Sequence, residues 1–174
     1  MVMRFSRRRF LVRAAGTAAA MWGVPAAFNA AHAASNAAPS APSAGPGAGR
    51  LVQVWKSPTC GCCKDWITHM QAAGFRTQVQ ETGNTAARAR LGIDARFGSC
   101  HTAVVQGYVL EGHVPAREVV RLLAERPKAL GLAVPGMPVG SPGMDGPEYG
   151  GRRDAYDVLL LTGGTASQVF QAYR

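Results

Sequence analysis

The chain has 174 residues, of which 47% are hydrophobic and 17% are charged, and its net charge is +9. Five of the 19 basic residues lie within the first 13 positions, so the rest of the chain has 14 basic side chains against 10 acidic ones, a net charge of +4. These remaining basic residues form no run and do not alternate with aromatic residues. We therefore expect no nucleic-acid partner.

The N-terminus has the parts of an export signal. Residues 7–9 are arginines followed by Phe-Leu, a weakly apolar stretch follows, and residues 31–34 read Ala-His-Ala-Ala. Paired arginines before such a stretch are typical of the twin-arginine route, which exports folded proteins. Glycine, proline and asparagine interrupt the apolar stretch, which argues against a membrane anchor. We predict a cleaved twin-arginine signal in residues 1–33 and a periplasmic protein with no stable membrane insertion.

Residues 34–49 consist of Ala, Pro, Ser, Gly and one Asn. Such a segment has no large apolar side chain to bury against its ordering entropy, so we predict a flexible tether. Residues 50–174 are long enough to bury a core of their own and contain no internal repeat. They are predicted to form one domain.

The first half of this domain predicts alternating strands and helices. Apolar alternation predicts a strand at residues 51–55, and residues 76–81 predict a second. Between them, apolar positions spaced i, i+3, i+4 and i+7 predict an amphipathic helix over residues 63–75, stopped by Gly74. Asn84 is expected to cap a short helix.

The second half begins with a loop or irregular helical turn at residues 91–98. Residues 102–106 and 108–114, separated by a glycine, predict an antiparallel hairpin. A helix is predicted from Pro115 to the stop at Pro127. Expected after it are a long Pro/Gly/Met loop over 131–151, a strand over 156–161, and a strand or helix over 166–173. This order predicts a thioredoxin-like α/β fold, a mixed sheet with flanking helices.

Three of the four cysteines lie within four residues, directly after the first predicted strand and before the helix. Thiolates select Cu(I), zinc or iron–sulfur clusters, and a Cys-x-x-Cys at such a turn is also the usual redox dithiol. Cys60 and Cys63 can converge, whereas the neighbouring side chains of Cys62 and Cys63 diverge and favour bridged ions. Amide groups at the helix start lower thiol pKa values, which favours either chemistry.

The fourth cysteine, Cys100, precedes the third predicted strand. In a thioredoxin-like fold its loop faces the start of the first helix, so Cys100 is expected to complete a ring of four sulfurs. A plain thiol oxidoreductase would have a cis-proline here, and Cys100-His101 favours a metal instead. His101 is either a metal ligand or a loop histidine bonded to a backbone carbonyl.

The expected compartment narrows the choice of metal chemistry. Exported thiols are paired in disulfides or protected by a metal, but three thiols in four residues close almost no loop and add little stability as disulfides. Zinc usually takes two separated Cys-x-x-Cys pairs, and the second pair is absent. Cu(I) tolerates bridging thiolates and fits best.

Softer ligands occur in the long loop. Met137 and Met144 do not belong to a regular apolar pattern that would pack in the core. Thioethers bind Cu(I) without forming disulfides, although either methionine could fill a core gap instead. His69 lies about 9 Å along the helix from Cys63, at about 1.5 Å per residue, too far for the same ligand set. We do not expect His113, in the hairpin, to be a ligand.

The motifs together resemble those of the CopG-like periplasmic copper-resistance proteins, over nearly all of residues 51–174. The resemblance implies a thioredoxin-like fold, copper handling that includes Cu(I)/Cu(II) cycling, and a copper cluster held by cysteine thiolates. The implied cluster ligands are Cys60, Cys62, Cys63 and Cys100, while His101 and the two loop methionines match the pattern. The matching segments are Lys56-Ser57-Pro58-x-Cys60-Gly61-Cys62-Cys63-x-x-Trp66-x-x-His69-Met70, Ser99-Cys100-His101-Thr102 and the glycine- and methionine-rich stretch 131–144.

Three hypotheses follow. The first is a periplasmic protein that binds several Cu(I) ions, with copper ions and other copper-handling proteins as partners. Copper oxidoreductase activity is left open for it, and metal binding is favoured over turnover of an organic substrate. The second is a thiol–disulfide oxidoreductase that uses Cys60 and Cys63. The third is a disulfide-stabilised binding module without metal chemistry.

Overall fold

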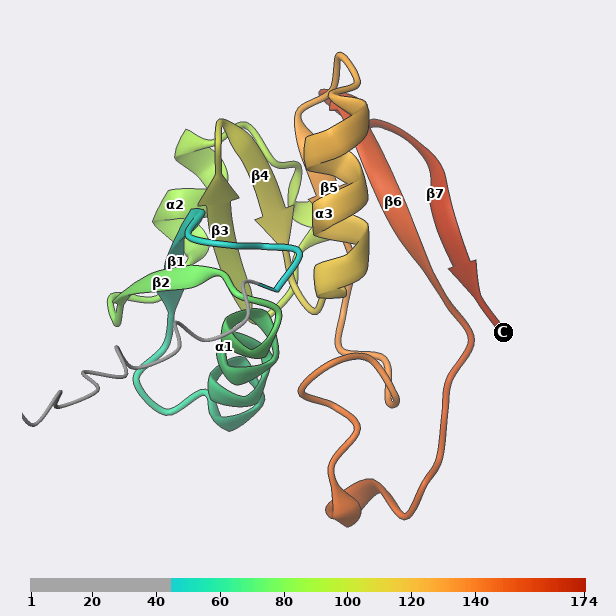
Figure 1. Cartoon of the computed structure of the whole chain (residues 1–174). Coiled ribbons are helices and arrows are strands. Elements are labelled where there is room, and N and C mark those ends of the chain that lie inside the picture. Colours follow the sequence, from blue (N-terminus) through green and yellow to red (C-terminus); the bar gives the residue numbers. More distant parts are fainter. Residues whose placement is uncertain (1–44) are drawn as a thin grey trace, which may run out of the picture. The chain divides into compact units, whose positions relative to one another are not determined.

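The computed structural model describes residues 45–174 (Figure 1), so the predicted export signal and most of the predicted tether lie outside the described residues. In chain order the elements are β1 (Leu51–Lys56), α1 (Gly61–Ala72), β2 (Arg76–Gln80), α2 (Thr85–Arg90), the 3-10 helix η1 (Ala95–Phe97), β3 (His101–Val105), β4 (Tyr108–Glu111), α3 (Ala116–Glu125), β5 (Gly131–Ala133), the 3-10 helix η2 (Pro147–Tyr149), β6 (Tyr156–Gly163) and β7 (Ala166–Tyr173).

The strands form one mixed seven-stranded sheet in the order β2-β1-β3-β4-β5-β6-β7. β1 pairs in parallel with β2, and β4 pairs in parallel with β5, while the other neighbours are antiparallel. A β1-α1-β2 crossover followed by the β3-β4 hairpin and α3 is the predicted thioredoxin-like arrangement. The prediction of fold class is confirmed.

The sheet buries its two faces under different helices. In Figure 1, α1 and α3 lie over one face, and α2 lies on the other. Because side chains alternate along a strand, neighbouring residues belong to different apolar clusters. Leu110 and Leu132 pack with α1 and α3, whereas Val109 and Ala133 pack with Ile93 and Phe97 on the far side.

Helix α1 begins two residues earlier than its apolar spacing predicts. Cys60 takes an extended conformation as the N-cap residue, so the helix starts at Gly61. Its buried residues are the predicted stripe, Cys63, Trp66, Ile67 and Met70. The cysteines therefore lie at the first turn of a helix whose inner face is fixed in the core.

The β3-β4 turn consists of Gln106 and Gly107, both with positive φ (47° and 87°). Two consecutive left-handed residues match the right-handed twist of the strands that they connect. The hairpin is thus confirmed, and its second strand ends at Glu111, before the predicted end at residue 114. Gly112 and His113 lie instead in the connection to α3.

The region after α3 contains more sheet than the sequence predicted. Residues 131–151 were expected to be a loop, but Gly131–Ala133 form β5, between β4 and β6. A Cβ atom on Gly131 would collide with the backbone of Val109, so a glycine permits this close pairing. Residues 166–173, left unassigned between strand and helix, form the edge strand β7.

The last residues of the predicted tether are ordered where the structure describes them. The Gly47 amide donates to the Ala73 carbonyl at 2.8 Å, and the Gly49 amide donates to the Gly74 carbonyl at 3.1 Å. Gly47 is buried against the ring of Phe75, which leaves no space for a side chain. The packed domain therefore begins before residue 50.

Among residues 45–174, no helix has both the length and the apolar character needed to cross a membrane.

The position of β5 predicts a large difference between two truncations. Leu132 is fully buried in β5, whereas Val169 is 56% exposed on the edge strand. Leu132→Ala should lower the free energy of unfolding by about 2–5 kcal/mol because it leaves a cavity, and Val169→Ala by less than about 1 kcal/mol. Denaturant unfolding of the metal-free protein measures both, and equal losses would contradict the central position of β5.

Candidate metal centre

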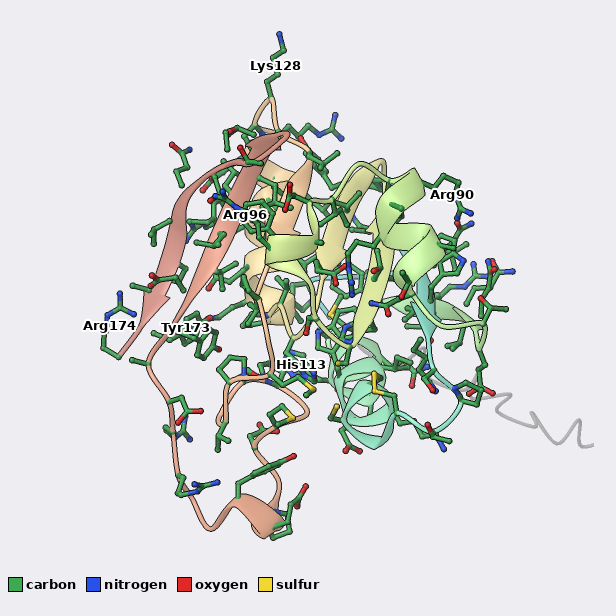
Figure 2. The ribbon with its side chains drawn as sticks, turned by 180° about the vertical axis from the view of Figure 1, so that it is seen from behind. Arg90, Arg96, His113, Lys128, Tyr173 and Arg174 are labelled. Atoms are coloured by element: carbon green, nitrogen blue, oxygen red, sulfur yellow. A yellow bond between two sulfur atoms is a disulfide. The ribbon has the colours of Figure 1, made fainter. Side chains whose placement is uncertain are left out.

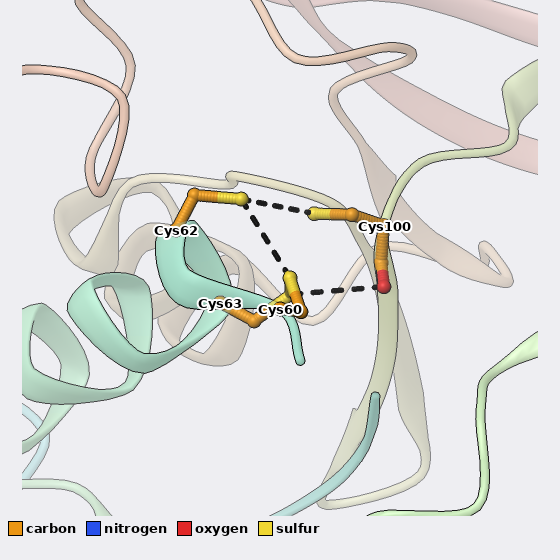
Figure 3. Close-up of side chains that lie close together, drawn as sticks. All are labelled: Cys60, Cys62, Cys63 and Cys100. Atoms are coloured by element: carbon orange, nitrogen blue, oxygen red, sulfur yellow. Dashed lines mark hydrogen bonds between the residues drawn. A yellow bond between two sulfur atoms is a disulfide. The ribbon is translucent and has the colours of Figure 1, made fainter. Parts of the chain in front are cut away.

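The four cysteines meet at one end of the sheet, as predicted from the sequence. Cys60, Cys62 and Cys63 lie at the start of α1, and Cys100 lies in the loop before β3 (Figure 3). The Sγ atom of Cys62 lies 3.6 Å from that of Cys60 and 3.8 Å from that of Cys100. All four Sγ atoms lie within 4.8 Å of one another. Sulfurs from the start of α1 and from the separate loop before β3 thus share one site.

The structure shows Cys60 and Cys63 joined in a disulfide, while Cys62 and Cys100 are free thiols. This confirms that the side chains of Cys60 and Cys63 converge. The remaining pair is in contact but not bonded, so the structure does not contain the two fixed disulfides of a purely stapled module. Cys63 is buried, and the other three cysteines are partly exposed, so one side of the sulfur cluster is open to solvent.

The loop that carries Cys60 is held by short local contacts. The Cys60 amide donates to the Ser57 carbonyl at 3.1 Å, which closes a turn around Pro58. The buried Lys56 ammonium group donates to the same carbonyl at 2.7 Å and pairs with Glu81 at 3.0 Å. No side chain caps α1 at Cys60, so the first-turn amides and the positive end of the helix dipole are available to sulfur anions.

Two fully buried histidines extend the site beyond the sulfurs. Cys100 Sγ lies 3.4 Å from His101 Nδ1 and 3.0 Å from His113 Nε2. These three side chains form a second group of converging ligand atoms that shares Cys100 with the four-cysteine group. His101, predicted as a ligand or a carbonyl-bonded loop residue, therefore lies within ligand reach.

His113 was not expected to belong to the site, and its position contradicts that expectation (Figure 2). Its Nδ1 lies 2.8 Å from the Pro142 carbonyl, which can only accept a hydrogen bond. Nδ1 therefore carries the proton, and Nε2 presents a lone pair to Cys100. The Gly112 amide donates to the His101 carbonyl at 2.9 Å, so the hairpin register brings His113 near His101. This register is the sequence signal that could have identified His113.

Burial sets the protonation of these groups. Burial, and then the neighbouring charge of Cys62, raise the pKa of the Cys100 thiol to about 12. Burial lowers the pKa of His113, and burial together with His113 lowers the pKa of His101 well below its usual range. Both imidazoles are therefore neutral near pH 7, which is the form that binds metals. Metal binding at Cys100 must release a proton.

The donor atoms fit a metal on two observations. Two sulfurs bonded to one ion at about 2.3 Å, with tetrahedral angles, lie about 3.8 Å apart, which matches the contacts of Cys62. His101 turns its Nδ1 toward Cys100, and its other ring nitrogen, Nε2, is buried and has no hydrogen-bond partner among the described residues. An unpartnered buried nitrogen is costly unless an ion or a water binds it. The residues therefore fit a soft metal ion.

The methionines predicted as ligands lie in the long loop over the start of α1. Gly143 packs so closely on α1 that a Cβ atom there would lie 2.5 Å from the Cys62 carbonyl oxygen. Met144 directly follows Gly143 in the sequence. Its Sδ atom accepts a hydrogen bond from the Tyr149 hydroxyl at 3.3 Å. Met137 is 51% exposed and lines a cavity of about 520 Å³ with Pro138 and residues of β6.

His69 lies outside the sulfur site, as expected from its position on α1. Its Nε2 accepts a hydrogen bond from the Ala116 amide at 3.0 Å, and so connects α1 to the first turn of α3. This contact gives His69 a structural role between two helices.

Comparisons with known proteins cover part of this site. A family model described as "Protein of unknown function, DUF411" matches residues 97–144, which include Cys100, His101, His113 and Met144. A search among curated proteins found no match.

Solved structures provide similarity over the whole domain. A structure titled "Copper resistance protein copG- Form 2" is 44% identical, covers 72% of this chain and 99% of its own chain, and has a TM-score of 0.66. One titled "Copper resistance protein copG- Form 1" is also 44% identical, covers 71% and 96%, and has a TM-score of 0.64. This chain belongs to the CopG family of copper resistance proteins.

Proposed function

We propose that this protein binds several Cu(I) ions in a thiolate cluster and protects the periplasm against copper. Cys60, Cys62, Cys63 and Cys100 are the proposed thiolate ligands. The observation that carries the proposal is that four converging sulfurs form one group of possible ligand atoms, that Cys100, His101 and His113 form a second, and that the two groups share Cys100. Bridging thiolates and low coordination numbers suit Cu(I) better than zinc.

Loading the full cluster requires reduction of the Cys60–Cys63 disulfide. Two electrons and two protons from a thiol reductant convert it to two thiols, and copper then replaces the thiol protons. Until then, Cys62, Cys100, His101 and His113 provide a smaller set of two sulfurs and two imidazoles. The proposed cluster therefore forms only under reducing conditions.

Cycling between Cu(I) and Cu(II) forms part of the proposal. Sulfur ligands favour Cu(I), whereas imidazole suits both oxidation states. Cys100 belongs to both ligand groups, so ions on the two sides of its sulfur would have different donors. His101 contributes to the nitrogen side, and its ring lies 4.2 Å from that of Trp66, which holds its orientation.

Periplasmic location by the twin-arginine route also remains part of the proposal, supported by the paired arginines and the small residues of residues 1–33. Met137 and Met144 are proposed as auxiliary thioether ligands. The packing of Gly143 on α1 supports this for its neighbour Met144, whereas Met137 is proposed on its thioether chemistry alone. Other copper-handling proteins of the same compartment are the proposed partners.

The first prediction about copper binding concerns stoichiometry. Anaerobic Cu(I) titration of the reduced protein should show several ions bound per chain. Cys62→Ser should bind fewer, because it removes the sulfur that contacts both Cys60 and Cys100. It leaves the Cys60–Cys63 pair intact, so an unchanged copper count in this variant would contradict the shared cluster.

The second prediction separates His113 from His69. His113→Asn can still donate to the Pro142 carbonyl but lacks the lone pair aimed at Cys100, so it should weaken Cu(I) binding about tenfold or more. His69→Asn should leave the affinity unchanged and lower only the stability. Competition with a chromophoric Cu(I) chelator measures both, and similar affinities for the two variants would remove His113 from the ligand set.

Thiol–disulfide exchange is the second candidate function, and the Cys60–Cys63 disulfide at the start of α1 is the observation that favours it. An oxidoreductase of this type would reduce insulin without metal and would not need Cys62 or Cys100. We expect the metal-free reduced protein to reduce insulin slowly and copper loading to stop the reaction, since copper occupies the same thiols. Rapid turnover by Cys62→Ser and Cys100→Ser variants would favour the dithiol function.

A further inference from the structure

Glu111 is a fully buried carboxylate at the end of β4, beside the loop that carries Cys100. It is not among the groups that could bind a metal together with the cysteines. A buried carboxylate is costly unless hydrogen-bond donors surround it. The hydrogen-bond donors around Glu111 therefore show which parts of the chain it holds in position.

These donors lie on both sides of Cys100 and His101. Glu111 Oε1 accepts a hydrogen bond from the Ser99 amide at 2.8 Å, and Oε2 accepts one from the Thr102 hydroxyl at 2.6 Å. Ser99 directly precedes Cys100, and Thr102 directly follows His101. One carboxylate thus clamps the two ends of the segment that provides a shared sulfur and an imidazole.

Residues on the neighbouring helix α2 complete the clamp. Arg88 donates through Nε to Glu111 Oε1 at 2.8 Å and through Nη2 to the Ser99 carbonyl at 2.5 Å. Asn84 Nδ2 donates to the same carbonyl at 3.1 Å. Both the amide and the carbonyl of Ser99 are therefore fixed by buried or half-buried charged groups, and charge-assisted hydrogen bonds are the stronger kind.

We propose that Glu111, with Arg88, is a positioning residue that holds Cys100 within reach of Cys62 and His113. It acts through the backbone of Ser99 and the hydroxyl of Thr102, without touching the metal. This inference rests on the proposed copper function only in that copper binding makes the position of Cys100 important. The position itself can be measured without copper.

The chain offers a matched control in Glu118. This glutamate is also buried, pairs with Arg117 and Arg121, and accepts a hydrogen bond from Tyr173 at 3.0 Å. Its partners lie on α3 and β7, away from both cysteine loops. Replacing either glutamate by glutamine removes a buried charge from an arginine network, but only Glu111→Gln alters the clamp on Cys100.

The experiment uses the metal-free protein with its Cys60–Cys63 disulfide intact, which leaves Cys62 and Cys100 as the two free thiols. Dibromobimane becomes fluorescent when it joins two nearby thiols. We expect rapid cross-linking in the wild type and in Glu118→Gln, and a severalfold slower rate in Glu111→Gln. Thr102→Val, which removes one donor and preserves the side-chain shape, should give a smaller decrease.

Cu(I) affinity and thermal unfolding are measured on the same four proteins. Glu111→Gln should weaken Cu(I) binding about tenfold or more. Glu118→Gln should lose a similar amount of stability without this loss of Cu(I) affinity. Cross-linking that slows equally in Glu111→Gln and Glu118→Gln, or in neither, overturns the positioning role. If cross-linking slows selectively in Glu111→Gln but the wild type binds no Cu(I), the proposed function is contradicted and the positioning role is supported.

Discussion

The metal centre depends on the antiparallel pairing of β1 with β3. This pairing places Lys56 opposite His101 and Trp55 opposite Thr102. The end of β1, which leads to Cys60, therefore lies beside the start of β3, which follows Cys100. Because side chains alternate between the faces of a sheet, a shift of one residue would turn His101 away from Trp66 and α1. The strand register therefore brings the two cysteine loops together and also selects the face on which the imidazole lies.

Rigid surroundings and solvent-accessible sulfurs coexist in this site because they belong to different parts of it. Glu111 and Arg88 fix the backbone of Ser99, directly before Cys100. Cys63 faces the core from a helix whose inner stripe is fully packed. The sulfurs of Cys60, Cys62 and Cys100 are partly exposed. In the proposed function, copper ions reach the free thiols of Cys62 and Cys100, which are already in place, and this reduces the entropy lost on binding.

Much of the fold and of the sulfur site could be predicted from the sequence, because the relevant signals are local. Apolar alternation marks β1, helical spacing marks α1, and the order of elements brings Cys100 to the start of α1. His113 could not be predicted this way, because its orientation depends on the carbonyl of Pro142, 29 residues further along the chain. The strand β5 was missed because it has three residues and contains Gly131, whose role appears only against Val109.

The central claim is that sulfurs from two loops hold several Cu(I) ions together in one pocket. X-ray absorption at the copper edge of the reduced, copper-loaded protein tests this claim most directly. We expect a Cu(I) edge, nearest neighbours that are mainly sulfur with a smaller nitrogen contribution, and scattering between neighbouring copper ions. A shell of only nitrogen and oxygen, or isolated copper without a copper neighbour, would contradict it.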